Sequence, residues 1–418
     1  MGKLHQAFFY ALIVLLPVQL GRHFWPESSY VLGLKIDYLS PTVYLTDLLI
    51  GLIFILWAWE EKARLTFRNL KSTAKNLWWV GAIFIFLLVN SVLAPSPLPA
   101  IFKFFKVLEF FLLAFYIAKN EFDLRTIRKL LSLVVAYSSL IVLGQFIKQA
   151  SLAGPFWWLG ERTFNAFSPG IAKAILAGQL VMRPYGTFPH PNALAGFILV
   201  SLILIGVSKK GFKVGKAFSW LPIFLGIGSL VVSFSRSAWL VCLLMGALIL
   251  LFQVKERERK AFSRLTIGNL SFFLFLVFLG GMVFYFGPRF STEEAFFLRM
   301  ESARVALRMV GDYPLTGVGL NNFIPQLPFY WQAPETVRFL QPVHNLYLLM
   351  IAETGLAGLV IFLWLLVLTV KKILGHYRLI FALSAILLLG FFDHYWLTLQ
   401  QNQLLLVLVL GLSWAKKK

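Results

Sequence analysis

The sequence contains very little cysteine and little charge. Cys242 is the single cysteine among 418 residues, so the chain can form neither an intramolecular disulfide nor a thiolate metal cluster. Charged residues make up 14% of the chain, compared with about 25% in soluble domains. This shortage of charge argues against a soluble globular protein, and we expect Cys242 to pack in an apolar core.

Several sequence motifs are also missing. The chain has no Gly-rich phosphate loop, no nucleotide-binding strand-turn-helix pattern, no ligand spacing for zinc and no internal repeat. Their absence argues against nucleotide-driven transport and against hydrolysis at a classical metal site. We therefore expect neither a cofactor nor a bound metal.

Apolar residues, in contrast, are abundant. They make up 59% of the chain and the mean hydropathy is +0.77. Because a membrane-spanning helix needs about 20 apolar residues, the chain has room for about 12 such helices. The expected fold is an all-α, polytopic integral membrane protein that forms a single domain over residues 1–418. The predicted spans are 4–20, 42–59, 77–93, 98–118, 127–148, 189–207, 217–235, 236–252, 268–287, 343–370, 378–396 and 397–414.

The first span resembles a signal peptide, because Lys3 precedes an apolar run. Pro17, Gln19 and Leu20 provide no small-x-small cleavage site, so we predict a retained helix.

Clusters of basic residues occur in every second segment that connects the predicted spans. The positive-inside rule then places both termini in the cytoplasm and the long loops 149–188 and 288–342 on the outer side. The formal charge of +21 is mostly this topological signal, so we expect no nucleic-acid partner. Arginines that remain outside need another explanation, either an anionic ligand or contact with lipid headgroups and carbonyl groups.

One such arginine is Arg236, between two predicted spans with almost no loop around it. An arginine at this depth is costly, so its charge must be compensated. Neighbouring serine hydroxyls and the carbonyls of a tight turn can do this structurally. The functional alternative is a guanidinium that binds phosphate oxygens with paired donors.

Two further groups of outer residues can bind an anion. Arg183 and His190 lie at the outer entry to the sixth span, where Pro189 and Pro191 restrict the chain and Asn192 can cap a helix. In the second long loop, residues 297–310 have the apolar spacing of an amphipathic helix at the membrane surface. That helix carries Arg299, Arg304 and Arg308.

His344 opens the tenth predicted span, where a neutral imidazole can accept a proton. It can equally cap backbone amides or lie among lipid headgroups. Asn345 follows it directly, and Gly355 and Gly358 come later in the same apolar segment, where glycines permit close packing. Glu353 in this segment is a candidate hydrogen-bonding partner, and a second acid–base group is the alternative role.

Three motifs together resemble the O-antigen ligase and polymerase superfamily of bacterial membrane glycosyltransferases. They are Arg236-x3-Leu240, the run from Arg299 to Pro314-Leu315-Thr316-Gly317-Val318-Gly319, and His344-Asn345-x9-Gly355-x2-Gly358. The number of spans and the large outer loop between the ninth and tenth spans agree with this resemblance. It implies a GT-C-like glycosyltransferase in the bacterial inner membrane with a periplasmic active site.

The resemblance also implies an activity and residue roles. Such enzymes move a glycan from a polyprenyl (undecaprenyl) diphosphate carrier to an acceptor hydroxyl, here the lipid A core or a similar lipid or glycan. Arg236 and Arg299 would bind the diphosphate, and His344 would activate the acceptor. Ala303 stands where relatives often have tryptophan, which leaves Arg304 or Arg308 as substitutes for Arg299. Polymerisation and transfer to a protein hydroxyl are the alternatives within the superfamily.

The chemistry of the residues fits this activity. A glycan diphosphate already carries its leaving group, so the enzyme needs cationic side chains for the diphosphate and a base for the hydroxyl. Arginines can neutralise the phosphates without a metal, and a single displacement inverts the anomeric centre. A secondary transporter is the alternative from another class, with Asp393 and His394 as a proton relay.

Overall fold

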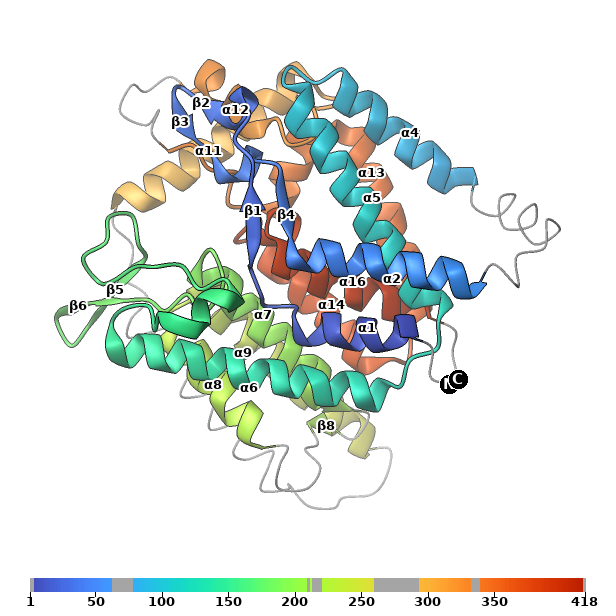
Figure 1. The fold of residues 1–418 in the computed structure, drawn as a ribbon, viewed down its shortest axis with the longest axis vertical. Coiled ribbons are helices and arrows are strands. Elements are labelled where there is room, and N and C mark those ends of the chain that lie inside the picture. The colour runs from blue at the N-terminus through green and yellow to red at the C-terminus, as the bar shows by residue number, and fades with distance from the viewer. Residues whose placement is uncertain are drawn as a thin grey trace.

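The computed structural model describes residues 4–61, 78–208, 211–212, 220–258, 293–331 and 339–415, and these are mostly helical (Figure 1). The N-terminal half contains α1 (Leu4–Val14), β1 (Gly21–His23), η1 (Glu27–Ser29), β2 (Tyr30–Val31), β3 (Leu34–Lys35), η2 (Asp37–Leu39), β4 (Thr42–Tyr44), α2 (Leu45–Glu61), α4 (Trp78–Val92), α5 (Pro97–Lys119), α6 (Leu124–Lys148), η3 (Gly154–Leu159), β5 (Lys173–Leu176), β6 (Gln179–Met182), α7 (Pro191–Gly206), β7 (Val207–Ser208) and β8 (Gly211–Phe212). The C-terminal half contains α8 (Leu221–Val232), α9 (Arg236–Glu258), α11 (Glu293–Asp312), α12 (Phe323–Tyr330), α13 (Leu346–Ile373), α14 (Tyr377–Gly390), α15 (Tyr395–Thr398) and α16 (Gln400–Trp414).

A helix occupies every predicted span except 268–287, which lies outside the described residues. By length and composition, α6 and α13 can each cross a membrane. The shorter apolar helices are α1, α4, α7, α8, α14 and the part of α9 up to Leu251. The helical class predicted from the sequence is confirmed, and these apolar helices suggest a membrane protein.

The described strands form only two-stranded antiparallel hairpins and pairs. β1 pairs with β4, with Arg22 opposite Val43, and β2 pairs with β3. β5 pairs with β6 inside the predicted outer loop 149–188, and β7 pairs with β8. The predicted loop 288–342 contains α11 and α12, which confirms a helix over 297–310. Its residues 288–292 and 332–338 lie outside the described part of the chain.

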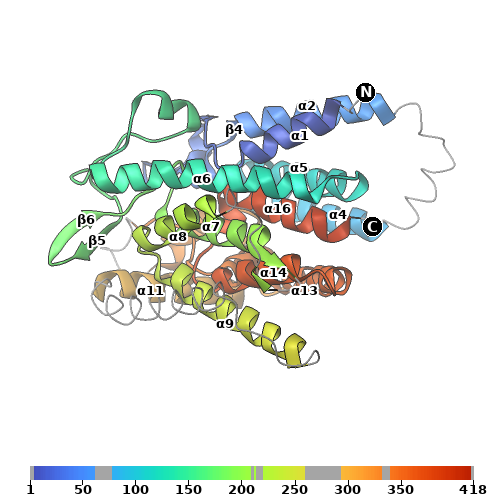
Figure 2. The same ribbon diagram turned by 90° about the horizontal axis from the view of Figure 1, so that it is seen from below.

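Helix α7 lies at the centre of the main core. All of its side chains are buried, and α6, α8, α9, α14 and α16 pack around it (Figures 1 and 2). A helix that is apolar on every face is expected to be surrounded in this way. Cys242 is buried in the same core, as expected.

A second, smaller core lies beneath the predicted outer loop. Val305 and Met309 of α11 are fully buried there, together with Phe323 of α12 and Leu349 and Ala352 of α13. Residues 31–39 of the N-terminal segment contribute Val31, Ile36 and Leu39 to the same cluster. The apolar face of α11 therefore packs on protein, and this packing joins the loop to α13.

Helix α13 is interrupted at Gly355, where φ is 65° and ψ is −167°. This conformation is essentially restricted to glycine. The segment 314–319 lies against the break: Leu356 N–H donates to the Pro314 carbonyl (2.8 Å) and Val318 N–H donates to the Ala352 carbonyl (2.8 Å). A Cβ atom on Gly355 would collide with the backbone of Leu315. The break therefore connects the second and third sequence motifs directly.

Lys106 of α5 forms a buried ion cluster with two carboxylates. Its Nζ lies 2.7 Å from Asp47 Oδ1 and 3.0 Å from Glu109 Oε2. Asp47 lies in the first turn of α2, and its Oδ1 also accepts a hydrogen bond from Gln400 Nε2 of α16. The cluster therefore joins α2, α5 and α16 inside the bundle, where unpaired charges would be costly.

We predict that Gly355→Ala destabilises the protein by roughly 2 kcal/mol or more, because alanine must adopt a backbone conformation reserved for glycine and collides with Leu315. The measurement is the midpoint of thermal unfolding of the purified protein in detergent. Gly81→Ala in α4 is the matched control, since a Cβ atom at that position meets no atom within 4 Å. Equal midpoints for the two variants would contradict the interpretation of the break.

Candidate functional site

The histidine that headed the third motif lies where several helix ends meet. His344 precedes α13, and its ring lies 5.4 Å, centroid to centroid, from the ring of His394, which precedes α15. Phe339 stacks on the other side of His344 at 5.9 Å. The Nδ1 atom of His344 is buried and has no hydrogen-bond partner among the described residues. A ring nitrogen without a partner is available to a substrate proton.

Asp393 is the carboxylate of this cluster. Its Oδ1 accepts the backbone N–H of His394 (2.8 Å) and lies 3.8 Å from Nε2 of the same histidine. Its Oδ2 accepts a hydrogen bond from Asn192 Nδ2 of α7 (3.1 Å). Asp393 is thus buried at the junction of α7 and the connection between α14 and α15.

Two contacts orient the His394 ring. Its Nδ1 forms a 2.7 Å hydrogen bond with Thr398 Oγ1, one turn along the chain. The ring of Tyr38 meets it edge to face at 5.6 Å. A buried imidazole held on both sides in this way has a defined orientation toward Asp393 and His344.

The histidines of the cluster lie in the connections between helices, and their pKa values are lowered. Burial is the largest cause at His344, His190 and His394, and the nearby Arg299 lowers all three further. The pKa falls to about 3 at His190 and to about 4 at His394. At neutral pH the imidazoles are therefore uncharged, which is the form that accepts a proton.

Asp393, in contrast to the neutral histidines, carries a charge. Burial raises its pKa, but the attraction of His394, His344 and His190 and the hydrogen bond from Asn192 outweigh this effect, so that the pKa is lowered to about 2. The carboxylate is therefore ionised. Its negative charge raises the pKa of His344 and so strengthens that histidine as a base.

Arg183 brings positive charge to the same place. Its Nε donates to the Ser233 carbonyl (2.8 Å) in the turn before Arg236, and its Nη2 donates to Asn192 Oδ1 (2.6 Å). Burial lowers the pKa of Arg183 to about 10, and repulsion from Arg299 and Arg236 adds to the effect. Three arginines from distant parts of the chain are thus close enough to repel one another. An anion between them would relieve this repulsion.

The three arginines of α11 differ in their contacts. Arg304 Nη1 lies 3.1 Å from Glu301 Oε2, and Arg308 Nη2 lies 3.8 Å from Glu301 Oε1. Arg308 also donates to the Tyr330 carbonyl. Arg299 has its charge close enough to affect Arg183, Arg236 and the histidines. These contacts favour Arg299 over Arg304 and Arg308 as a ligand for an anion at His344.

The predicted supporting residues act on the backbone around the site. Asn345 caps α13 by accepting the N–H groups of Tyr347 and Leu348, both at 2.9 Å, and its Nδ2 donates to the Phe391 carbonyl. Glu353 is directed to the 321–323 turn, where Oε1 accepts the Phe323 N–H. Gly358 leaves room for the side chain of Thr354 within α13. Asn345 therefore joins the start of α13 to the segment that carries Asp393.

The expected cap of α7 is wrong in detail. The structure places His190 before the helix, and its Nδ1 accepts the backbone N–H of Asn192 (3.1 Å). Asn192 instead uses its side chain to join Asp393 to Arg183. The helix begins at Pro191, two residues earlier than a cap at Asn192 implies, so His190 takes the capping position.

His344, Asp393 and His394 can also be considered as metal ligands. Each offers one ligand atom, and these atoms lie within 4.8 Å of one another. Tetrahedral zinc with bonds of about 2.1 Å would require separations of about 3.4 Å, so the side chains would have to move closer. Three nearby arginines oppose a divalent cation in the same place. The donor set is suitable for a metal, while its electrostatic surroundings favour an anion.

Two residues of this cluster have a different predicted role from the one that their positions suggest. Asp393 and His394 supported a proton relay in a transporter, but the structure places them beside His344. Lys103 of α5 is absent from the predicted site residues; its Nζ donates to the Leu397 carbonyl, and its charge acts on His394. An ionisable residue inside an apolar segment is the signal by which all three can be recognised, and for Lys103 it was missed.

The comparison with known families agrees with these motifs. Residues 221–363 match the family model described as O-antigen ligase. The expected resemblance is confirmed. The matched segment runs from α8 into α13 and contains Arg236, Arg299, His344, Gly355 and Gly358. No curated protein matches the chain. The similarity to O-antigen ligases and polymerases therefore covers all three motifs, whereas Arg183, Asp393 and His394 lie outside the match.

We predict that the pKa of His344 lies below 6.5 in the wild-type protein and falls further in Asp393→Asn, because the substitution removes the charge that stabilises the imidazolium form. The measurement is histidine ¹⁵N NMR of labelled protein in detergent, with His344→Gln used to assign the signal. A pKa that rises in Asp393→Asn would contradict the arrangement described.

Proposed function

We propose that this protein is a membrane glycosyltransferase that moves a glycan from a polyprenyl diphosphate carrier to an acceptor hydroxyl. The observation that carries the proposal is a neutral, buried histidine with an unpartnered ring nitrogen, beside an ionised carboxylate and close to three arginines. Similarity to the O-antigen ligases supports the same reaction class. The acceptor is the lipid A core or a similar lipid or glycan, and the reaction takes place on the periplasmic side of the bacterial inner membrane.

The reaction is a single displacement. The acceptor oxygen attacks the anomeric carbon of the glycan as the bond from that carbon to the diphosphate oxygen breaks. His344 accepts the hydroxyl proton, and Asp393 stabilises the imidazolium ion that forms. The diphosphate leaves with both electrons of the broken bond, so the configuration at the anomeric carbon is inverted.

Arginines stabilise the leaving group in this mechanism. Arg236 and Arg299 bind the diphosphate oxygens with paired donors, and Arg183 adds positive charge while it holds Asn192 in place. Because the region is partly buried, each charge acts more strongly than it would in water. Guanidinium groups then supply the neutralisation that a metal ion provides in other transferases.

A ligase is favoured over a polymerase, because the His344-Asn345-x9-Gly355-x2-Gly358 pattern is characteristic of ligases and the matched family is described as O-antigen ligase. The two activities differ only in the acceptor, which is a lipid core in the first case and another glycan in the second. Transfer to a protein hydroxyl uses the same donor chemistry. Assays with the three acceptor classes side by side distinguish these activities.

We predict that His344→Ala lowers the turnover of glycan transfer by about 10² to 10⁴-fold, the usual contribution of a general base, while donor affinity is retained. The measurement is transfer from a polyprenyl diphosphate-linked glycan to an acceptor by protein reconstituted in liposomes. A variant as fast as wild type would show that His344 is not the base, and a product with retained configuration would exclude a single displacement.

A chelator serves as the control for metal chemistry in the same assay. Transfer that persists after EDTA treatment agrees with arginine-based neutralisation. Loss of activity that zinc or another divalent ion restores would assign His344, Asp393 and His394 as metal ligands instead.

We predict that Arg299→Gln raises the KM for the donor at least tenfold, because a charge-assisted hydrogen bond to phosphate contributes about 1.5 to 3 kcal/mol. Arg308→Gln is the matched comparison on α11, and its KM should change less, since Arg308 contacts Glu301 and Tyr330. Lys129→Gln, an exposed charge on α6, controls for general electrostatic effects. The reverse order, with Arg308→Gln more impaired, would assign the diphosphate to Arg308.

A further inference from the structure

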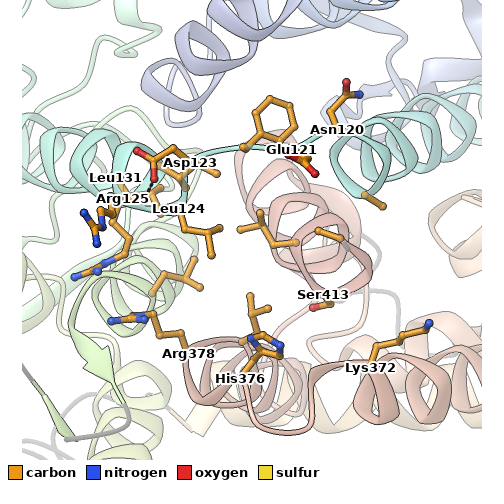
Figure 3. Close-up of a pocket in the computed structure, with 18 of the residues that line it drawn as sticks. Asn120, Glu121, Asp123, Leu124, Arg125, Leu131, Lys372, His376, Arg378 and Ser413 are labelled. Carbon is orange, nitrogen blue, oxygen red and sulfur yellow. Dashed lines mark hydrogen bonds between the residues drawn. The ribbon is translucent and has the colours of Figure 1, made fainter. Parts of the chain in front are cut away.

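A cavity of about 970 Å³ lies at the other end of the helices that carry the histidine cluster. Helix α13 starts beside His344 and ends at Ile373, and α14 runs back from Tyr377 toward Asp393. The cavity lies where α13 gives way to α14, and its other walls come from the connection between α5 and α6 and from the end of α16 (Figure 3). The length of these two helices therefore separates the cavity from the proposed active site.

The charged residues around this cavity are mostly basic. Five basic residues line it, against two carboxylates; the basic residues are Lys119, Arg125, Arg128, Lys372 and Arg378. One of the carboxylates, Asp123, caps α6 and accepts the N–H groups of Arg125 and Thr126, so its oxygens are already engaged. The cavity therefore has an excess of positive charge that the described residues do not balance.

Arg128 and Arg378 carry the argument. The Nε atoms of both are buried, and neither guanidinium forms a hydrogen bond or an ion pair within the described part of the chain. Arg128 lies on α6 and Arg378 on α14. Their positive charges are close enough to repel each other. Figure 3 shows the side chains of Arg125 and Arg378 near the same side of the cavity. An anion with several acceptor oxygens would supply the partners that these two Nε–H donors lack.

The remaining wall is apolar. Ile127 and Leu131 of α6 contribute to it, together with Leu204 of α7, Leu379 of α14 and Leu412 of α16. At the rim, Lys119 Nζ lies 5.3 Å above the ring of Phe115 and Lys372 Nζ lies 5.7 Å above the ring of Trp414. Lysines and tryptophans of this kind are typical of membrane interfaces. A free phosphate ion would gain nothing from the apolar wall, whereas a phospholipid would cover it with the start of its acyl chains.

We propose that this cavity binds the phosphate headgroup of an anionic phospholipid, with Arg128 and Arg378 as the principal phosphate ligands. The positive-inside rule places this end of the helices at the cytoplasmic leaflet, where anionic lipids meet basic pockets between helices. The bound phosphate would offset the repulsion between α6 and α14 and so hold these two helices together. This site does not depend on the proposed transferase activity.

The test measures the thermal unfolding midpoint of the purified full-length chain in detergent micelles. Phosphatidylglycerol is added to the micelles, and phosphatidylcholine and inorganic phosphate are added in separate arms. Because a ligand that binds only the folded state stabilises it, phosphatidylglycerol should raise the midpoint saturably. The other two additions should have little effect.

The Arg128→Gln/Arg378→Gln double variant should need about tenfold more phosphatidylglycerol, or more, for the same shift, since two charge-assisted contacts are lost. Without lipid it should be at least as stable as wild type, because removing the two charges removes their repulsion; a purely structural role for the arginines predicts the opposite. Lys129→Gln is the matched control, an exposed charge on α6 outside the cavity lining, and it should respond as wild type does.

Three results would overturn the proposal. They are an unchanged response to phosphatidylglycerol in the double variant, an equal loss of response in Lys129→Gln, and protection of the wild type by inorganic phosphate or phosphatidylcholine to the same extent. Native mass spectrometry of lipid adducts provides a second measurement that does not depend on unfolding. The Arg128→Lys/Arg378→Lys variant keeps the charges, and it should retain part of the adduct.

Discussion

The structure depends on the hydrogen bonds that the backbone N–H and carbonyl groups of α13 make where the helix is interrupted at Gly355. Inside a bilayer every backbone N–H and carbonyl group needs a partner, because no water is available to replace one. The segment 314–319 provides these partners, with reciprocal hydrogen bonds to residues 352–357. Asn90 of α4 adds a contact to the Thr316 carbonyl, which attaches the same segment to another helix. The predicted outer loop is thus bound to the apolar helix that begins beside His344.

Around His344, one negative charge lies a short distance from a group of positive charges. Asp393 lies among histidines that burial keeps neutral, while Arg183, Arg236 and Arg299 lie close enough to repel one another. The first arrangement suits a base that must accept a proton, and the second suits an anionic leaving group. Asn192 contacts both Asp393 and Arg183, so the two halves of the site share one positioning residue. A different set of basic residues surrounds the cavity at the far end of the helices, where no such acidic partner is engaged with Arg128 or Arg378 among the described residues.

The sequence pattern predicted the positions of most helices, because long apolar runs between charged connections have few other solutions. Helix ends were less predictable: His190 caps α7 in place of Asn192, since Pro191 already belongs to the helix. The apolar face of α11 was assigned to the membrane surface, whereas Val305 and Met309 pack in a protein core with residues from the N-terminal segment. Spacing within one segment identifies an apolar face, but it carries no information on which distant segment will cover it.

Composition and motif spacing alone indicated a helical chain with the character of a membrane protein and a similarity to the O-antigen ligases, and they singled out His344 as the candidate base. Only the tertiary structure decided which carboxylate accompanies that histidine, because Asp393 follows His344 by a whole helical hairpin and meets it only when α13 and α14 pack side by side. The same holds for Arg183 and Arg299, which lie far apart in the chain. Hydropathy is a local property of the sequence, whereas the charge environment of a buried imidazole is the sum over every segment that packs against it.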